Sequence, residues 1–306
     1  MATYSREQIN EEMHLYFDQQ YAKQYLMSAI YRNHFLKQSD VLVGEPDTSV
    51  LDGVSQFLEE HIADLMKITH VTNAGLLYTR SKEGKKKLSG GLEKVVENER
   101  EVYYPEKRKR GGKEQLEKYI AKFMNQKPYG EIGKIMSIEV PLNQRISDGN
   151  GKIDMLGYDS NSHRVSILEL KKPTSNESIL RCVMEAFTYY RQLDCKKLLE
   201  DFREDFQKED DKLENSAIPK KLVTFAISPL VYEGGRAYND LVNDLAKDKE
   251  SDRHLSNFMY ALSKELNTEA KEHGLGGAVI RPLCYKVNAA KTNYEVKRIK
   301  GWDYDV

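Results

Sequence analysis

The chain has 306 residues, enough for one large domain or two ordinary ones, and its 47 lysines and arginines nearly balance 48 aspartates and glutamates. A net charge of −1 excludes a strongly basic protein, so any affinity for nucleic acid must come from locally placed charge. Cys182, Cys195 and Cys284 are too few and too scattered for a disulfide framework or a Cys-x-x-Cys metal site. The chain shows no secretory signal core and no apolar run approaching the roughly 18 residues of a membrane span, so we expect a soluble, cytoplasmic protein without membrane association.

Helical periodicity dominates the first part of the chain. Apolar residues recur at three- and four-residue spacing over 5–36 and again over 48–67, which predicts two amphipathic helices. Asp47 or Thr48 could cap the start of the second helix. We therefore expect a mainly helical N-terminal region at 1–110.

Two basic, glycine-containing stretches follow at 80–91 and 106–113. Their simpler interpretation is solvated surface loops. The alternative is a strip that contacts phosphates beside a nucleic-acid groove. The sequence leaves both open.

From residue 111 onwards helical and strand-like segments alternate, which predicts a mixed α/β domain at 111–306. The predicted helices cover 113–126, 177–208 and, in several pieces, 235–272. The predicted strands cover 135–142, 151–158, 164–171, 221–230, 278–287 and 293–302.

The segment GKIDMLGYDSNSHRVSILELKK at 151–172 carries the pattern of greatest chemical interest. Its acid-any-lysine triplet, Glu169 to Lys171, recurs elsewhere, for example at 295–297, so only the context makes it informative. Here the triplet ends an apolar strand whose alternation puts Glu169 and Lys171 on the face of the buried aliphatic residues. Charged groups in such a place need a partner or a metal ion.

The preceding strand contributes Asp154. A turn centred between Asn161 and Ser162 pairs Asp154 directly with Glu169, with Cβ atoms roughly 4.5–5.5 Å apart. The two carboxylates, the Leu170 carbonyl and water are ligands suited to Mg²⁺ or Mn²⁺. A register shifted by one residue would instead place the two acids on opposite faces.

Lys171, on the same face, would contact the attacking water or the scissile phosphate. We expect a desolvated lysine beside a cation to have a lowered pKa, so it could either take a proton from water or stabilise developing charge.

Together these residues resemble the PD-(D/E)xK phosphodiesterase superfamily, which has the restriction-endonuclease-like fold. The resemblance covers about 113–230, where Asp154 matches the first acid, Glu169 the second acid and Lys171 the lysine, while Ile153 replaces the proline. It implies an α/β restriction-endonuclease-like core, with a central mixed sheet flanked by helices. It also implies a metal-dependent nuclease, and it alone favours DNA over RNA.

Many members of this superfamily carry a further acid on the first core helix. Glu114 and Glu117 are both candidates, and we favour Glu117 as an additional catalytic acid. Some nuclease branches also have glutamine followed by tyrosine four residues later in the helix after the motif. Glu185 and Tyr189 stand at these positions, where ordinary helical roles are at least as well supported.

The sequence thus predicts a Mg²⁺-dependent phosphodiesterase, an endo- or exodeoxyribonuclease, whose partner is nucleic acid and which works as a homo-oligomer or within a repair or defence complex. Three alternatives remain open. The acids and the lysine could merely mark a solvated sheet edge. The chain could be a non-catalytic nucleic-acid-binding module of a restriction, repair or defence complex. It could also be an interaction protein built on its N-terminal helices, which predicts no metal binding.

Overall fold

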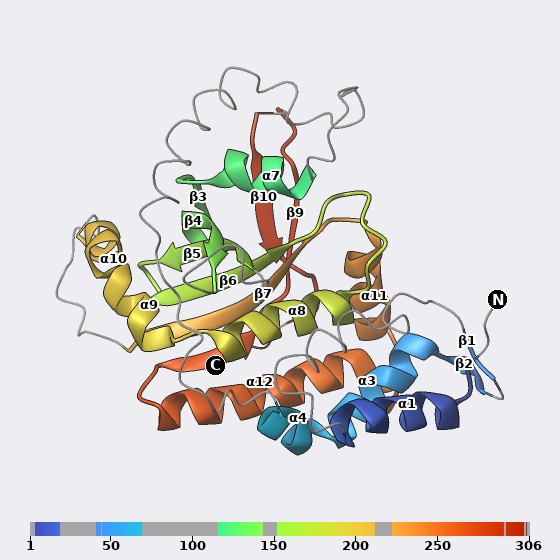
Figure 1. The fold of residues 1–306 in the computed structure, drawn as a ribbon. Coiled ribbons are helices and arrows are strands. Elements are labelled where there is room, and N and C mark those ends of the chain that lie inside the picture. Colours follow the sequence, from blue (N-terminus) through green and yellow to red (C-terminus); the bar gives the residue numbers. More distant parts are fainter. Residues whose placement is uncertain are drawn as a thin grey trace.

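A mixed sheet with helices on both faces organises the protein (Figure 1). The computed structural model describes residues 4–18, 41–43, 45–68, 116–142, 152–211, 222–290, 292–302 and 304. The predicted mixed α/β class with a central mixed sheet is confirmed. Within the described residues, no helix combines the length and the apolar character needed to cross a membrane.

Among the residues that the structure describes, the sheet contains eight strands. β6, β7, β8 and β9 run parallel where they pair, and the other pairs are antiparallel. The strands follow the order β10-β9-β7-β6-β5-β4-β3, and β8 pairs with β7. Their bounds are β3 (Pro128–Tyr129), β4 (Gly133–Pro141), β5 (Lys152–Asp159), β6 (Arg164–Leu170), β7 (Thr224–Tyr232), β8 (Gly277–Ile280), β9 (Leu283–Val287) and β10 (Tyr294–Arg298). A separate two-stranded sheet joins β1 (Val41–Leu42) to β2 (Glu45–Ser49).

Helices cover both faces of the sheet, with α7 on one side and α8 and α12 on the other (Figure 1). The bounds in the described parts of the chain are α1 (Arg6–Asp18), α3 (Val50–Glu60), α4 (Ile62–Ile68), α7 (Leu116–Met124), α8 (Ile179–Gln192), α9 (Cys195–Asp201), α10 (Arg203–Asp210), α11 (Arg236–Leu245), the short η4 (Glu250–Asp252) and α12 (His254–Glu272).

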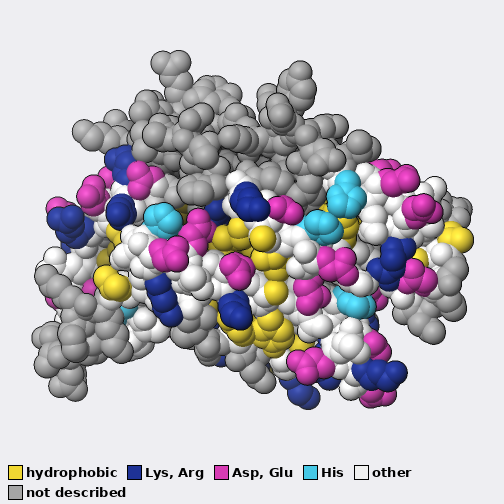
Figure 2. All heavy atoms as spheres, turned by 90° about the horizontal axis from the view of Figure 1, so that it is seen from below, with side chains coloured by type: hydrophobic (Ala, Val, Ile, Leu, Met, Phe, Trp, Pro, Cys, Tyr) yellow, Lys and Arg dark blue, Asp and Glu magenta, His cyan; other side chains and the backbone are white. Residues whose placement is uncertain are grey.

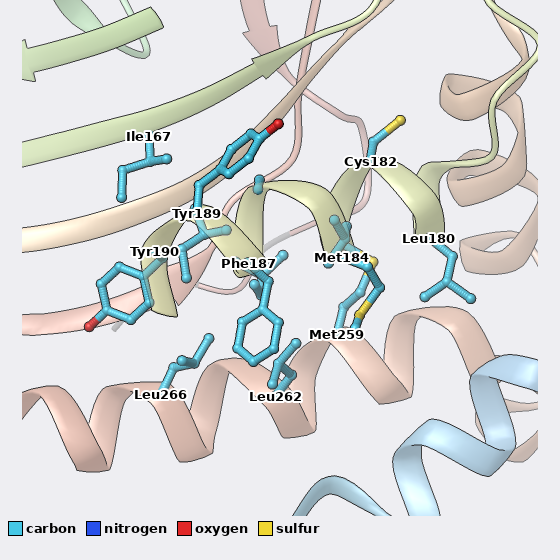
Figure 3. Close-up of a cluster of buried hydrophobic side chains, with 14 of the residues drawn as sticks. Ile167, Leu180, Cys182, Met184, Phe187, Tyr189, Tyr190, Met259, Leu262 and Leu266 are labelled. Atoms are coloured by element: carbon cyan, nitrogen blue, oxygen red, sulfur yellow. The ribbon is translucent and has the colours of Figure 1, made fainter. Parts of the chain in front are cut away.

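Alternation along β6 divides its buried side chains between two hydrophobic clusters. Leu168 and Leu170 pack in the cluster that contains α7. Ile167 belongs to the larger cluster with α8 and α12. Figure 3 shows α8 between the sheet and α12, with Phe187 directed toward α12 and Tyr189 toward the sheet.

The predicted helix over 177–208 was wrong in its continuity, because three helices occupy this segment. α8 ends where Leu193 adopts an extended backbone conformation. Asp194 then accepts a hydrogen bond from the backbone N–H of Lys197 and caps α9. A second break follows at Phe202, which precedes α10.

The predicted strand over 278–287 is likewise divided, into β8 and β9. Arg281 and Pro282 separate them, and proline has no backbone N–H to donate to a neighbouring strand. Both pieces still pair with β7, first at its beginning and then at its end.

The N-terminal helices differ in detail from the prediction. The region 48–67 contains α3 and α4, and the cap of α3 is Ser49 rather than Asp47 or Thr48, which lie in β2. Ser49 and Asp52 form a reciprocal capping box that stabilises this helix start. The predicted helix over 5–36 is described only as α1, and its remainder lies outside the described residues, as do the basic stretches 80–91 and 106–113.

The N-terminal helices pack into the same hydrophobic cluster as α8 and α12, through residues such as Ile9 and Val54. Lys247, just after α11, donates hydrogen bonds to Asp52 of α3 at 2.8 Å and to Asp244 at 3.0 Å. Acidic and basic side chains are interspersed on the face of the molecule shown in Figure 2, so the described part of that face carries no large patch of one charge.

Candidate functional site

The hairpin of β5 and β6 has the predicted register. Met155 lies opposite Leu168, and extending the same pairing by one residue places Asp154 opposite Glu169. At this end of the hairpin Asp154 Oδ2 accepts a hydrogen bond from the N–H of Leu170 at 2.9 Å. A side-chain oxygen thus serves as the acceptor for this N–H in place of a backbone carbonyl. The pairing therefore brings the two predicted metal-binding acids to one end of the hairpin.

Lys171 lies immediately beyond β6, and its ammonium group is surrounded by carboxylates. It donates hydrogen bonds to Glu169 Oε1 at 2.7 Å and to Glu185 Oε2 at 2.9 Å. A third carboxylate oxygen, Glu177 Oε2, lies 2.8 Å from Lys171 Nζ. Since Lys171 is only 7% exposed, these three acids provide most of its polar environment.

This environment raises the pKa of Lys171, the opposite of the direction expected for a lysine beside a cation. Burial disfavours the ammonium form, but the negative charges of Glu169, Glu185 and Glu177 outweigh it. An ammonium held in this way keeps its proton at neutral pH. The structure therefore supports charge stabilisation by Lys171 rather than proton removal from water.

The buried carboxylate of Asp154, by contrast, has too few favourable contacts to offset the cost of burying its negative charge. Burial is the main cause that raises the pKa of Asp154 to about 7. The hydrogen bond from Leu170 and the charge of Lys171 act against this rise, whereas the nearby acids Glu185 and Glu117 increase it.

Glu169 is also an unstable anion in this structure. Burial, followed by the charge of Asp154, raises the pKa of Glu169 well above its ordinary value despite the ion pair with Lys171. Its Oε2 is buried and has no hydrogen-bond partner among the described residues. The pair Asp154 and Glu169 thus carries more negative charge than its surroundings neutralise.

Glu117 approaches the pair of Asp154 and Glu169 from the face of the sheet opposite to α8 (Figure 1). It lies on α7, and its Oε1 accepts a hydrogen bond of 3.4 Å from the backbone N–H of Lys172. Its charge contributes to the raised pKa of Asp154. The preferred helix acid is therefore near the predicted site, whereas its rival Glu114 lies outside the described residues.

The helix after the motif contributes more than the sequence analysis expected. Glu185 contacts Lys171, and Tyr189 donates a hydrogen bond to Glu185 Oε1 at 3.1 Å. Sequence reasoning missed Glu177 and Arg181, whose side chains form an ion pair at 3.1 Å. The signal was present, since Glu177, Arg181, Glu185 and Tyr189 recur at four-residue spacing, with Glu177 two residues before α8 and the other three on one side of it.

Distant strands hold the backbone of Lys171. Its N–H donates to the carbonyl of Leu230 on β7 at 3.0 Å, and its carbonyl accepts from the Tyr285 hydroxyl of β9 at 2.8 Å. A separate contact holds the start of α8, where Asp240 of α11 accepts a hydrogen bond from the N–H of Ile179. Burial raises the pKa of Asp240 to about 6.

The donor set fits a divalent cation in its chemistry. Asp154 and Glu169 offer hard oxygen ligands, one of them a buried oxygen without a partner, and a cation would relieve their repulsion. The side chains alone do not form a complete metal site, since in the described ranges no group of three or more His, Cys, Asp or Glu side chains is placed to hold a metal ion. The N–H of Leu170 donates a hydrogen bond to Asp154, and metal binding by the Leu170 carbonyl stays a prediction.

Two cavities, of about 230 and 720 Å³, lie elsewhere in the molecule, one lined by Arg191 and Glu269 and the other by Tyr260 and Lys264. Neither includes the acids of the hairpin.

Comparison of the chain with protein-family models, with curated proteins and with solved structures found no match.

Proposed function

We propose that this protein is a metal-dependent nuclease that hydrolyses phosphodiester bonds with Mg²⁺ or Mn²⁺, and that DNA is its substrate. The observation that carries the proposal is the pairing of Asp154 with Glu169 across the hairpin, with Lys171 two residues further along. The preference for DNA rests on the resemblance to the PD-(D/E)xK superfamily.

In this proposal Asp154 and Glu169 hold the cation, and Glu117 supports it from α7. A bound Mg²⁺ would polarise the phosphate and lower the pKa of a water molecule. Lys171 keeps its proton and stabilises the negative charge that grows on the phosphate oxygens. The water oxygen forms a bond to phosphorus and gives up one proton to the solvent, while the bond from phosphorus to one sugar oxygen breaks and that oxygen takes up a proton from the solvent.

The test is cleavage of a plasmid with Mg²⁺ or Mn²⁺ by the wild type and by Asp154→Asn and Lys171→Ala. We expect each substitution to lower the rate by about a hundredfold or more, the typical loss for a group that stabilises transition-state charge. The chain offers a matched control in Lys297, which forms an exposed acid-any-lysine ion pair with Glu295 at 3.2 Å, so Lys297→Ala should cleave as the wild type does.

Calorimetry with Mn²⁺ separates loss of chemistry from loss of metal. The wild type should bind Mn²⁺, and Asp154→Asn should bind it more weakly. Cleavage by Lys171→Ala at the wild-type rate would refute the assigned roles. Tight DNA binding without cleavage by the wild type would instead favour the non-catalytic nucleic-acid-binding module.

A further inference from the structure

The three carboxylates around Lys171 are not equivalent. Glu169 and Glu185 accept well-aligned hydrogen bonds from the ammonium group. Glu177 Oε2 is as close, at 2.8 Å, but it has no hydrogen-bond partner within the described residues, so its contact with Lys171 is an ion pair without that alignment. Glu177 is therefore the neighbour that Lys171 can exchange most easily.

The position of Glu177 points the same way. It lies between β6 and α8, outside both elements, and its side chain is 23% exposed, more than that of Glu169 or Glu185. Its other oxygen, Oε1, contacts the guanidinium of Arg181 at 3.1 Å. One carboxylate thus bridges an ammonium group and a guanidinium group.

Arg181 is incompletely satisfied by this carboxylate. Only its Nη2 contacts Glu177, whereas its buried Nε and Nη1 have no hydrogen-bond partner in the described structure. A guanidinium group carries five N–H donors in a planar fork that matches phosphate oxygens, and a lysine beside it supplies a further positive charge. A phosphate has more acceptor oxygens than the carboxylate that now fills the space.

We propose that Lys171 and Arg181 form a phosphate-binding subsite, which the Glu177 carboxylate occupies in this structure and which a phosphate group of the ligand takes over. This inference deepens the proposed function and rests on it for the identity of the ligand. Exchange of the carboxylate for a phosphodiester, each with one negative charge, leaves the charge balance around Lys171 unchanged. Glu169 and Glu185 keep the ammonium group in place while Glu177 moves away.

The test compares the binding of inorganic phosphate, measured by calorimetry, by the wild type, Glu177→Gln and Arg181→Gln. Removal of the competing charge should tighten binding by Glu177→Gln about fivefold, and loss of the guanidinium should weaken binding by Arg181→Gln about tenfold. Glu233→Gln is the matched control. It removes a similar charge just after β7, where Glu233 pairs with Lys286 at 3.0 Å, and its phosphate affinity should stay at the wild-type value.

Equal phosphate affinities of Glu177→Gln and Glu233→Gln, or wild-type affinity of Arg181→Gln, would overturn the subsite. Thermal denaturation of each variant shows that it is folded, and Arg181→Lys should restore part of the affinity because it keeps the charge without the fork.

A second arm identifies the source of the phosphate, using a short DNA duplex without terminal phosphates and with Ca²⁺ in place of Mg²⁺. If the variants bind the duplex with the same order of affinities as they bind inorganic phosphate, the natural ligand is a backbone phosphodiester. If the substitutions change the binding of inorganic phosphate but not that of the duplex, the natural ligand is a free monophosphate. If the wild type does not cleave but the phosphate series holds, the nuclease proposal fails and the subsite stands. If the wild type cleaves and neither substitution changes phosphate binding, the subsite fails and the nuclease proposal stands.

Discussion

Substitution of Asp154 by asparagine should stabilise the metal-free protein at alkaline pH. Asparagine keeps an oxygen that can accept the hydrogen bond from Leu170 and removes the charge that burial penalises. The pKa of Asp154 is about 7 in the folded protein against 3.8 for an ordinary aspartate. Each pKa unit is worth about 1.36 kcal/mol, so the full shift corresponds to about 4 kcal/mol.

The sign follows from proton binding. Because the folded state holds this proton more tightly than the unfolded state, the contribution of Asp154 to wild-type stability is most favourable below pH 4 and falls as the pH rises through 7. Local relaxation and water reduce the cost of burying such a charge, so we expect Asp154→Asn to gain roughly 1–2 kcal/mol at pH 8, or roughly 2–5 °C in melting temperature.

The assay is thermal denaturation of the wild type and Asp154→Asn with EDTA, at pH 8 and pH 4. The gain should be present at pH 8 and absent at pH 4, where both side chains are neutral. Addition of Mn²⁺ at pH 8 should raise the melting temperature of the wild type and change that of Asp154→Asn much less. A variant that is less stable than the wild type at pH 8, or equally stabilised at both pH values, would refute the electrostatic argument.

Two further predictions concern the scaffold. Gly133→Ala should destabilise the protein by roughly 2–4 kcal/mol in urea denaturation, because φ is 78° at this position and a Cβ would lie 2.0 Å from a carbonyl oxygen of β5. Gly130→Ala, where no atom lies within 4 Å of the added Cβ, should stay within about 0.5 kcal/mol of the wild type, and equal effects of the two would contradict the steric explanation. Lys247→Met should cost roughly 1–3 kcal/mol by the same measurement, since it leaves the buried Asp244 without its cationic partner. A similar loss in Lys264→Met, on the exposed side of α12, would show that the ion pair is not the cause.

The hairpin could be predicted because its information is local. The polar turn and the alternation of β5 and β6 determine the register within about twenty residues, so Asp154 and Glu169 were placed correctly opposite each other. The environment of Lys171 could not be predicted in the same way. Its additional neighbours come from α8 and β9, whose packing against the strand end depends on the whole sheet.

The helix boundaries show a related limit. Periodicity alone gave a single helix over 177–208, since apolar residues continue at helical spacing across both breaks. Asp194 nevertheless favours a new helix start, because its side chain competes for the first free backbone N–H groups. Likewise Pro282 marks the interruption between β8 and β9, although the apolar run around it reads as one strand.

The hydrogen bond from Tyr285 to the carbonyl of Lys171 links residues 114 positions apart. During synthesis the hairpin with Asp154 and Glu169 leaves the ribosome long before β9 does, and at about 5–20 residues per second the delay is several seconds. Through that interval the strand end that presents Lys171 lacks its tyrosine contact. The nascent chain thus carries the complete hairpin before the strands that support it have been made, and the arrangement around Lys171 is completed only after β9 has been synthesised.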